Sequence, residues 1–190
     1  MDLGAPILEA WAKGERAPRR KLQFSLIYAP IIGILVSATT LLVTLIPSET
    51  LNTEDIAGKV PSAWESLLSA FYGGLFEEIT MRFFFMTLYA WFISLVIAKV
   101  RRKKFEPSKV ALWISILISG LAFGAGHLIT ASQMVTLSPA IISKIMLGNG
   151  IPGVVFGYLY WKRGLEASMA AHFTGDIVLH VIPMLFVYLR

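Results

Sequence analysis

Apolar residues occur in long segments along this chain, separated by short stretches rich in charged residues, proline and glycine. A helix needs about 20 apolar residues to cross the hydrocarbon layer of a bilayer. Such helices are predicted over residues 22–46, 64–98, 110–130, 134–161 and 165–189. The fourth contains "GNGIPG", which is expected to break it and to give one interrupted span or two short helices. The pattern therefore predicts an all-α, polytopic transmembrane helical bundle with five to six spanning helices.

The composition agrees with a membrane protein, because 56% of the residues are hydrophobic and 15% are charged. A soluble domain is about half apolar and about a quarter charged. The net charge of +5 lies in short blocks beside the apolar segments, which indicates membrane topology signals and no nucleic-acid partner. Basic blocks follow residues 12, 99 and 162, so the amino terminus is expected in the cytoplasm. We expect a cytoplasmic segment at 1–21 and a single transmembrane domain at 22–190.

Several ionisable residues lie inside the predicted spans. A charge at the centre of a bilayer costs at least about 2.5 kcal/mol, so each such residue is a candidate for a functional site. All three histidines of the chain are among them, and the absence of cysteine excludes a thiol nucleophile. The ionisable residues in the spans are Glu77, Glu78, Arg82, His127, Lys144, His172, Asp176 and His180.

Helical spacing organises these residues. Glu78 and Arg82 are four residues apart and are expected to pair, whereas Glu77 points about 100° away from Glu78. His172, Asp176 and His180 repeat every four residues and form one polar stripe. If the helices pack side by side, the residues that can converge on one cavity are Glu77, His127, His172 and Asp176. Glycines are expected to permit close helix approach at positions 73, 74, 120, 124, 126, 153, 157 and 175.

A carboxylate and two imidazoles in a wet pocket within the membrane suit hydrolysis by an activated water. The carboxylate can accept a proton from the water, one imidazole can orient it, and another can donate to an oxyanion. The same groups could instead hold a divalent metal such as zinc. His180 is better explained by packing, and Lys144 by extension of its side chain toward the interface.

Three motifs carry a resemblance to a known family. "EEITMR" at 77–82 matches EExxxR, "FGAGH" at 123–127 matches FxxxH, and "HFTGD" at 172–176 matches HxxxN/D. In this order on successive apolar segments, they resemble the CPBP family of intramembrane proteases, which includes the CAAX prenyl endopeptidases and bacteriocin-processing proteins. The resemblance covers residues 64–180 and implies an intramembrane endopeptidase that cuts near the carboxyl end or the leader of a membrane-associated substrate.

The resemblance also implies residue roles and a location. Glu77 would be the general base, with His127 helping to activate water, while His172 and the residue at 176 would stabilise the oxyanion. The remaining motif residues, Glu78, Arg82 and Phe123, would give structural support. No cofactor is favoured; in a metal-dependent enzyme the ligands would be Glu77, His127, His172 and Asp176. The expected location is the cell membrane of a prokaryote, in contact with membrane lipid.

Position 176 is Asp, where many members of the family carry Asn. An ionised aspartate cannot donate a hydrogen bond to an oxyanion. Asp176 is therefore protonated, orients His172 or binds a metal. Depth raises a further question: Glu77 lies about 31 Å and His172 about 10 Å from their cytoplasmic helix ends. Their convergence requires the 64–98 helix to tilt or to protrude, or "WKRG" at 161–164 to lie inside a cavity. The alternative functions are a non-catalytic immunity or chaperone-like protein and a small proton-coupled transporter.

Overall fold

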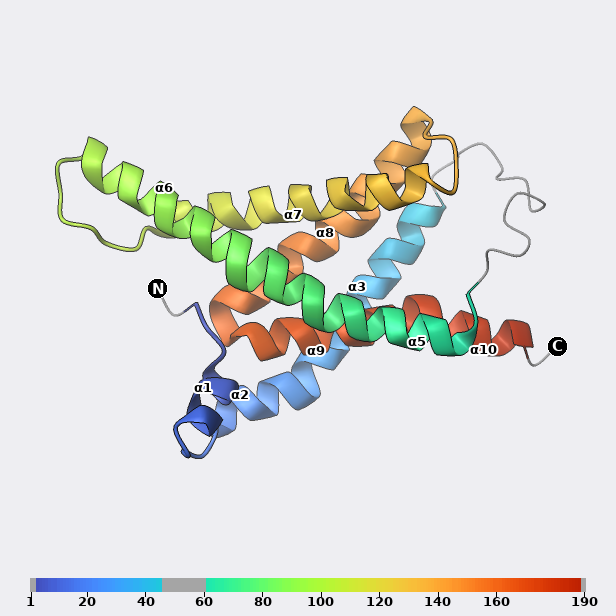
Figure 1. Ribbon diagram of the computed structural model, residues 1–190, viewed down its shortest axis with the longest axis horizontal. Helices are drawn as coiled ribbons and strands as arrows, with labels where there is room; N and C mark the ends of the chain where they lie inside the picture. Colours follow the sequence, from blue (N-terminus) through green and yellow to red (C-terminus); the bar gives the residue numbers. More distant parts are fainter. Residues whose placement is uncertain (1–2, 46–60, 189–190) are drawn as a thin grey trace.

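The computed structural model describes residues 3–45 and 61–188, which contain helices and no strands (Figure 1). The predicted span ends at 46 and 189 lie outside these residues. The helical elements, with η marking π-helical turns, are α1 (Pro6–Ala12), α2 (Arg19–Gln23), η1 (Phe24–Tyr28), α3 (Ala29–Thr44), α5 (Ala63–Tyr72), η2 (Gly73–Glu77), η3 (Ile79–Met86), α6 (Thr87–Val100), α7 (Lys109–Ser132), α8 (Pro139–Arg163), α9 (Leu165–Asp176), η4 (Ile177–Val181) and α10 (Ile182–Tyr188).

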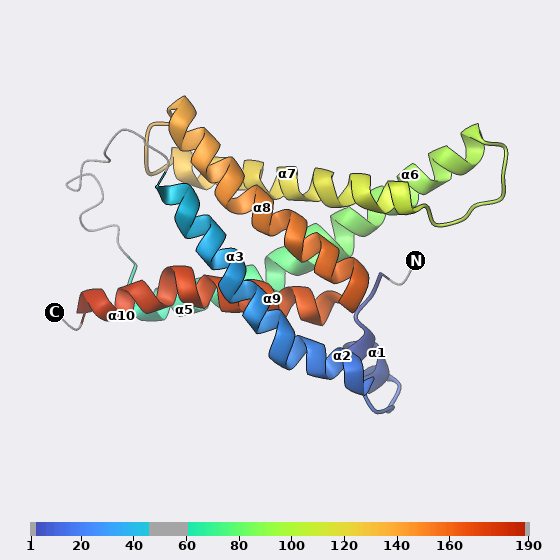
Figure 2. The ribbon, with the colours of Figure 1, turned by 180° about the vertical axis from the view of Figure 1, so that it is seen from behind.

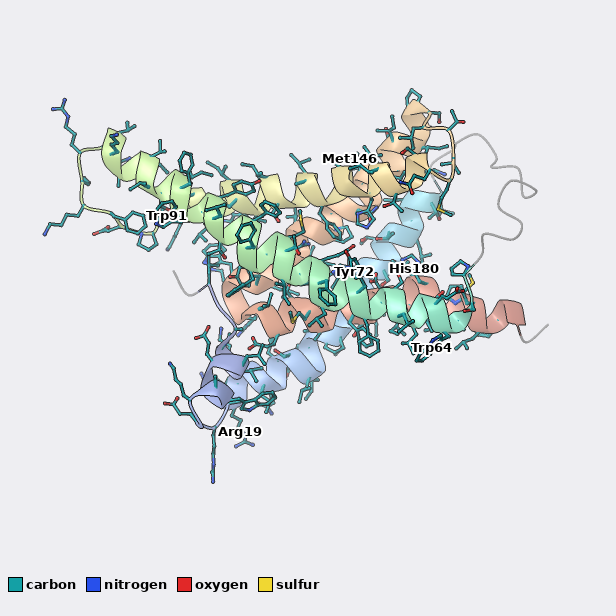
Figure 3. The ribbon with its side chains drawn as sticks, viewed as in Figure 1. Arg19, Trp64, Tyr72, Trp91, Met146 and His180 are labelled. Atoms are coloured by element: carbon teal, nitrogen blue, oxygen red, sulfur yellow. The ribbon has the colours of Figure 1, made fainter. Side chains whose placement is uncertain are left out.

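These elements join into continuous helices that confirm the predicted all-α membrane bundle. Five of them, within the described ranges, are long and apolar enough to cross a bilayer. They are Arg19–Thr44, Ala63–Val100, Lys109–Ser132, Pro139–Arg163 and Leu165–Phe186. Large apolar side chains such as Trp64 and Trp91 project outward from the second of these helices, as expected for surfaces that face lipid (Figure 3).

The predicted break at "GNGIPG" is wrong, because α8 runs unbroken through Pro152. A proline inside a helix lacks the N–H that would bond the carbonyl four residues earlier, here that of Gly148. Thr40 on α3 donates its hydroxyl to this carbonyl at 3.1 Å. A neighbouring helix thus satisfies the carbonyl that the proline leaves open, and 139–163 forms one span.

Glycines allow the helices to approach each other closely, as predicted, with one exception. A Cβ added to Gly120 of α7 would lie 2.7 Å from Val154 Cγ2 and 3.1 Å from Gly150 O, both on α8. The two helices lie side by side in both views (Figures 1 and 2). Gly33 of α3 likewise faces the backbone of Ala171 on α9. Gly126 was predicted to serve the same purpose, but a Cβ there would meet no atom within 4 Å.

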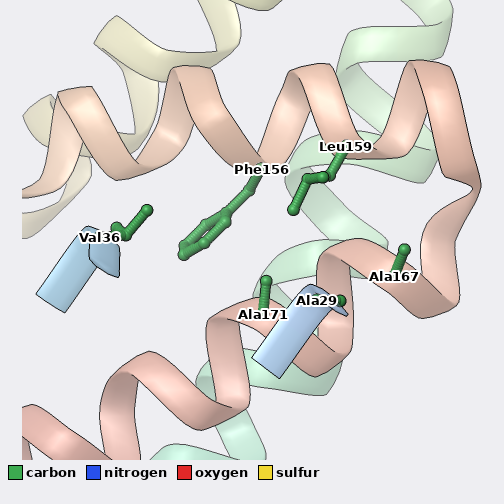
Figure 4. Packing of buried hydrophobic residues seen from close by; sticks show 6 residues of the cluster. All are labelled: Ala29, Val36, Phe156, Leu159, Ala167 and Ala171. Carbon is green, nitrogen blue, oxygen red and sulfur yellow. The ribbon is translucent and has the colours of Figure 1, made fainter. Parts of the chain in front are cut away.

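Small side chains let α3, α8 and α9 share one core. Phe156 and Leu159 project from α8 toward the alanines of α9, and residues of α3 lie against them (Figure 4). We call this cluster the α3–α8–α9 core; its buried members are Ala29, Val36, Phe156, Leu159, Ala167 and Ala171. The core holds α9, which carries His172 and Asp176 of the candidate site, in a fixed relation to α8.

The helix from Ala63 to Val100 has 38 residues. Its length is about 57 Å, nearly twice the roughly 30 Å thickness of a bilayer core. Its α6 end projects with the start of α7 beyond the other helices (Figures 1 and 2). A helix of this length must tilt or protrude. The distance of Glu77 from the cytoplasmic end of its helix is therefore not its depth in the membrane, and Glu77 can contact α9.

The segment predicted as a polar cytoplasmic tail, 1–21, is partly folded onto the bundle. Ile7 of α1 is buried, and the first spanning helix already begins at Arg19. Glu166 at the start of α9 accepts hydrogen bonds from the backbone N–H groups of Ile7 at 2.8 Å and Leu8 at 2.9 Å. The segment is therefore anchored at the turn between α8 and α9.

Candidate active site

The two adjacent glutamates of "EEITMR" occupy different environments. Glu77 ends the π-helical turn η2, and Glu78 lies between η2 and η3. The Glu78 side chain is fully buried, whereas 27% of the Glu77 side chain is exposed. Since π-helical turns are frequent at functional sites, their position here is consistent with a site at this pair. The glutamates diverge around the helix, as their spacing predicts.

Glu78 is the centre of a buried polar network. Its Oε2 lies 3.3 Å from Arg82 Nε, which confirms the predicted pair. Its Oε1 lies 2.8 Å from His172 Nδ1, and Ser168 on α9 donates its hydroxyl to Oε2. Glu78 therefore ties two helices together and orients the imidazole of His172. Because a carboxylate paired with arginine is an acceptor, Nδ1 of His172 carries the proton of this hydrogen bond.

The other ring nitrogen of His172 faces two further carboxylates. Its Nε2 lies 3.8 Å from Oε2 of Glu77 and 3.5 Å from Oδ2 of Asp176. The ring stacks on Phe156 with centroids 4.8 Å apart and meets the edge of Phe123 at 5.5 Å. Two aromatic contacts and one hydrogen bond thus fix the orientation of a buried imidazole.

Gly73 permits this arrangement. A Cβ at Gly73 would lie 3.2 Å from His172 Nε2 and would overlap Oδ2 of Asp176. The neighbouring Gly74 is in similar contact with Phe173, where a Cβ would lie 2.7 Å from the Phe173 Cβ. The glycine pair lets the η2 backbone rest directly on α9, and any side chain at position 73 would occupy the space between the polar groups.

A cavity of about 240 Å³ adjoins Glu77. Liquid water occupies about 30 Å³ per molecule, so the cavity has room for several waters or for a short peptide segment. Of the described residues that line it, Glu77 is the one carboxylate and His127 the one imidazole. The lining residues are Tyr72, Phe76, Glu77, Thr80, Met81, Ala122, Phe123, Gly126, His127 and Thr130.

His127 is oriented by its own helix. Its Nδ1 lies 2.8 Å from the carbonyl oxygen of Phe123. A carbonyl only accepts, so Nδ1 carries the proton and Nε2 is left as an acceptor. The Phe123 ring centroid lies 4.7 Å from that of His127. Phe123 thereby separates the two histidines and forms part of the cavity wall.

The expectation that four residues line one cavity is corrected in part. Glu77 and His127 line it, whereas His172 and Asp176 are not among its lining residues. Nε2 of His172 lies near both Glu77 and Asp176, so His172 and Asp176 adjoin Glu77 without lining the cavity. Glu77 is thus the link between the cavity and the buried network.

Two other ionisable residues of the spans lie outside this cavity lining. His180 is exposed, and its Nε2 lies 4.0 Å from Oδ1 of Asp176, which extends the predicted stripe. Lys144 donates to the carbonyl oxygen of Thr44 at 3.1 Å. Neither residue belongs to the polar groups that surround Glu77.

The donor set does not fit a metal ion. Within 3–45 and 61–188, no three His, Asp or Glu side chains are grouped so that they could hold one. Nδ1 of His127 bonds the carbonyl of Phe123 and Nδ1 of His172 bonds Glu78, which leaves both Nε2 atoms open, so the spacing of the groups and not the histidine nitrogens speaks against a metal. No chemical step below is therefore routed through a metal.

Ser168 was missed in the sequence. It is fully buried and lies four residues before His172 on the same face of α9. The spacing of four that connects His172, Asp176 and His180 could have been extended backward to include it. Serine bonds readily within its own helix, however, so its type alone did not indicate a partner on another helix.

Comparison with known proteins agrees with the site. The family model described as "Type II CAAX prenyl endopeptidase Rce1-like" matches residues 59–178, more than half of the 190-residue chain. The match includes all three motifs, from Glu77 to Asp176. No curated protein and no solved structure matches the chain. The chain belongs to the Rce1-like family of type II CAAX prenyl endopeptidases, which are intramembrane proteases.

Proposed function

We propose that this membrane protein hydrolyses a peptide bond near the carboxyl end or in the leader of a membrane-associated substrate, with a water activated by Glu77 and His127. The observation that carries the proposal is the position of Glu77. It is the one carboxylate among the described lining residues of the cavity, which it shares with His127, and it also faces His172. A general base has to reach both the water and the groups around it.

The steps follow from these positions. A water in the cavity donates a hydrogen bond to Glu77 and another to Nε2 of His127. Its oxygen attacks the carbonyl carbon of the substrate while one of its protons passes to Glu77. The C–N bond then breaks, and Glu77 returns that proton to the leaving amine. The products are an amine and a carboxylic acid, which becomes a carboxylate when the second proton of the attacking water passes to solvent, and the glutamate is regenerated.

His172 is the proposed donor to the oxyanion. Glu78 holds its Nδ1, so the ring presents Nε2 toward Glu77, and the proposal requires the substrate carbonyl to bind beside Glu77, between the cavity lining and this Nε2. Because Nδ1 already donates its proton to Glu78, this role requires His172 as an imidazolium, whose Nε2–H stabilises the negative charge of the tetrahedral intermediate. Asp176, 3.5 Å from Nε2, accepts from this group before substrate binds and so keeps the ring in position. In this proposal Asp176 and Glu78 are positioning residues.

The cavity lining suits a substrate that arrives through the lipid. Tyr72 and Phe76 are more than half exposed and lie at the cavity. Apolar side chains at the cavity favour a peptide with an apolar or lipid-modified segment. The proposed location is the cell membrane of a prokaryote, and the distribution of basic blocks favours an amino terminus in the cytoplasm.

The test is cleavage of a prenylated peptide with a CAAX carboxyl terminus by the full chain in lipid vesicles. Loss of a general base lowers the rate roughly 10²- to 10⁴-fold, which is the expectation for Glu77→Gln. The matched control is Glu106→Gln, which removes an exposed carboxylate between α6 and α7. Cleavage by Glu77→Gln at the wild-type rate would overturn the proposal, provided that the control is also active.

A further inference from the structure

A second hollow lies between the first spanning helix and the last turns of α8. Its volume is about 470 Å³, and it shares no lining residue with the cavity around Glu77. Most of its walls are apolar or aromatic, and two cationic side chains lie at its α8 end. We call it the α3–α8 groove; its lining residues are Phe24, Ile32, Val155, Tyr158, Leu159, Lys162 and Arg163.

The apolar part of the groove is a firm surface. Phe24, Ile32 and Val155 are half-buried and pack against the α3–α8–α9 core, of which Leu159 is a buried member. Packing against a core restricts the rotamers of these side chains. The groove therefore offers a preformed, mostly apolar surface that can accommodate a hydrocarbon chain.

The cations are held in place by aromatic rings. Lys162 Nζ lies 3.5 Å from the centroid of the Trp161 ring, and Arg163 Cζ lies 4.3 Å from that of Phe24. A ring face attracts a cation without using its N–H groups in conventional hydrogen bonds, so those donors stay available for an anion. Lys21 adds a third positive charge by donating to the carbonyl oxygen of Lys162 at 3.3 Å.

The cations lie at the level where lipid headgroups are expected. Arg163 ends the spanning helix Pro139–Arg163, so its charge lies at the edge of the apolar segment. Trp161 and Tyr158 flank it, and these residue types concentrate at membrane interfaces. Arg19 projects outward where α2 begins (Figure 3). Among the described residues that line the groove there is no carboxylate to oppose an anion.

We propose that the α3–α8 groove binds one anionic phospholipid of the surrounding bilayer. An acyl chain lies against Ile32, Val155 and Leu159, and the phosphate accepts hydrogen bonds from Lys162 and Arg163. The charges select against a zwitterionic lipid, whose headgroup would bring a further positive group toward two cations. This site uses none of the residues proposed for hydrolysis, so it stands independently of the proposed reaction.

The test measures lipid retention by the purified full chain in neutral detergent, titrated with phosphatidylglycerol or with phosphatidylcholine of the same chains. Native mass spectrometry counts the bound lipids. Two basic residues facing an anionic headgroup change its affinity roughly 30-fold, so K162Q/R163Q is expected to weaken phosphatidylglycerol by that factor and leave phosphatidylcholine unchanged. The matched control is K103Q/K104Q, which removes two exposed cations outside the groove and is expected to bind as wild type. Equal weakening by both double variants would overturn the proposal.

A second variant tests the apolar part of the groove. Val155→Trp fills the groove and keeps both cations, so it is expected to lose bound phosphatidylglycerol; because Val155 packs against the α3–α8–α9 core, retained peptide cleavage and a cooperative thermal transition without lipid check that the variant is folded. Wild-type retention by this variant would overturn the proposal. So would displacement of the lipid by inorganic phosphate alone, which would indicate a simple anion site, or by farnesol, which would indicate a site for a prenyl group.

Discussion

Oε1 of Glu78 lies 2.8 Å from Nδ1 of His172, on the side of the imidazole that faces away from Asp176 and Glu77. The two consecutive glutamates thus face different nitrogens of the His172 ring: Glu78 faces Nδ1 and Glu77 faces Nε2. One glutamate is fully buried beside an arginine and holds the ring; the other is partly exposed at a cavity. Glu78 therefore positions the imidazole, and Glu77 is the glutamate placed for catalysis. Mutations of the two glutamates are expected to have different consequences.

Glu78→Gln is expected to destabilise the protein, whereas Glu77→Gln is not. Removing one partner of a buried ion pair leaves an uncompensated charge, here that of Arg82, and costs about 3–5 kcal/mol. The measurement is thermal unfolding of both variants in the same detergent. The double variant Glu78→Gln/Arg82→Gln should recover part of the loss, because it leaves no unpaired charge. Equal unfolding midpoints for the two single variants would contradict this assignment.

Gly73→Ala is expected to lower activity far more than stability. The added methyl group would contact His172 Nε2 and Asp176 Oδ2 and displace them from each other. A displacement of about 1 Å in a catalytic group can cost roughly 100-fold in rate. The matched control is Gly148→Ala, outside the cavity lining, where the methyl group makes only an ordinary contact 3.6 Å from Thr40 Cγ2 and the gain in helix propensity is about 1 kcal/mol. If both alanine variants cleave alike, the close approach at Gly73 has no catalytic importance.

Asp176→Asn is expected to retain or increase the turnover number. Asparagine keeps an acceptor for the His172 N–H group and adds an N–H donor that can reach an oxyanion. Asp176→Ala removes both, and misplacement of the imidazole should lower kcat roughly 10- to 100-fold with a smaller change in KM. Steady-state kinetics on the prenylated peptide distinguish these outcomes. An inactive Asp176→Asn would mean that the reaction needs the negative charge at this position.

Much of the fold could be predicted from the sequence because a bilayer imposes simple rules. Segment length and apolar composition predicted the five spans, and the spacing of four predicted the Glu78–Arg82 pair. The continuity of α8 could not be predicted, since Thr40 on another helix provides the hydrogen bond that compensates for Pro152. Local rules for proline consider only the helix that contains it.

The sequence predicted which residues form the candidate site better than it predicted which of them contact each other. Motif spacing placed Glu77, His172 and Asp176 on faces that meet. It did not show that His172 would bond Glu78 and reach the cavity only through Glu77, because that depends on a backbone contact at Gly73. Contacts between helices depend on small residues whose partners lie far away in sequence, and one sequence shows the residues but not their partners.

Removal of divalent metals is expected to leave hydrolysis unchanged. Water activation is assigned to Glu77 and His127, and no three His, Asp or Glu side chains of residues 3–45 and 61–188 are grouped as metal ligands. The measurement is the cleavage rate in vesicles after dialysis against EDTA, together with the metal content of the protein. A second sample receives zinc after dialysis and should cleave at the same rate. Activity that is lost on dialysis and restored by zinc in wild type, but not in His127→Gln, would instead show that the cavity histidine is a metal ligand. The assignment of Glu77 as the general base and of Glu78 as a positioning residue would then have to be replaced by one that includes the metal ion.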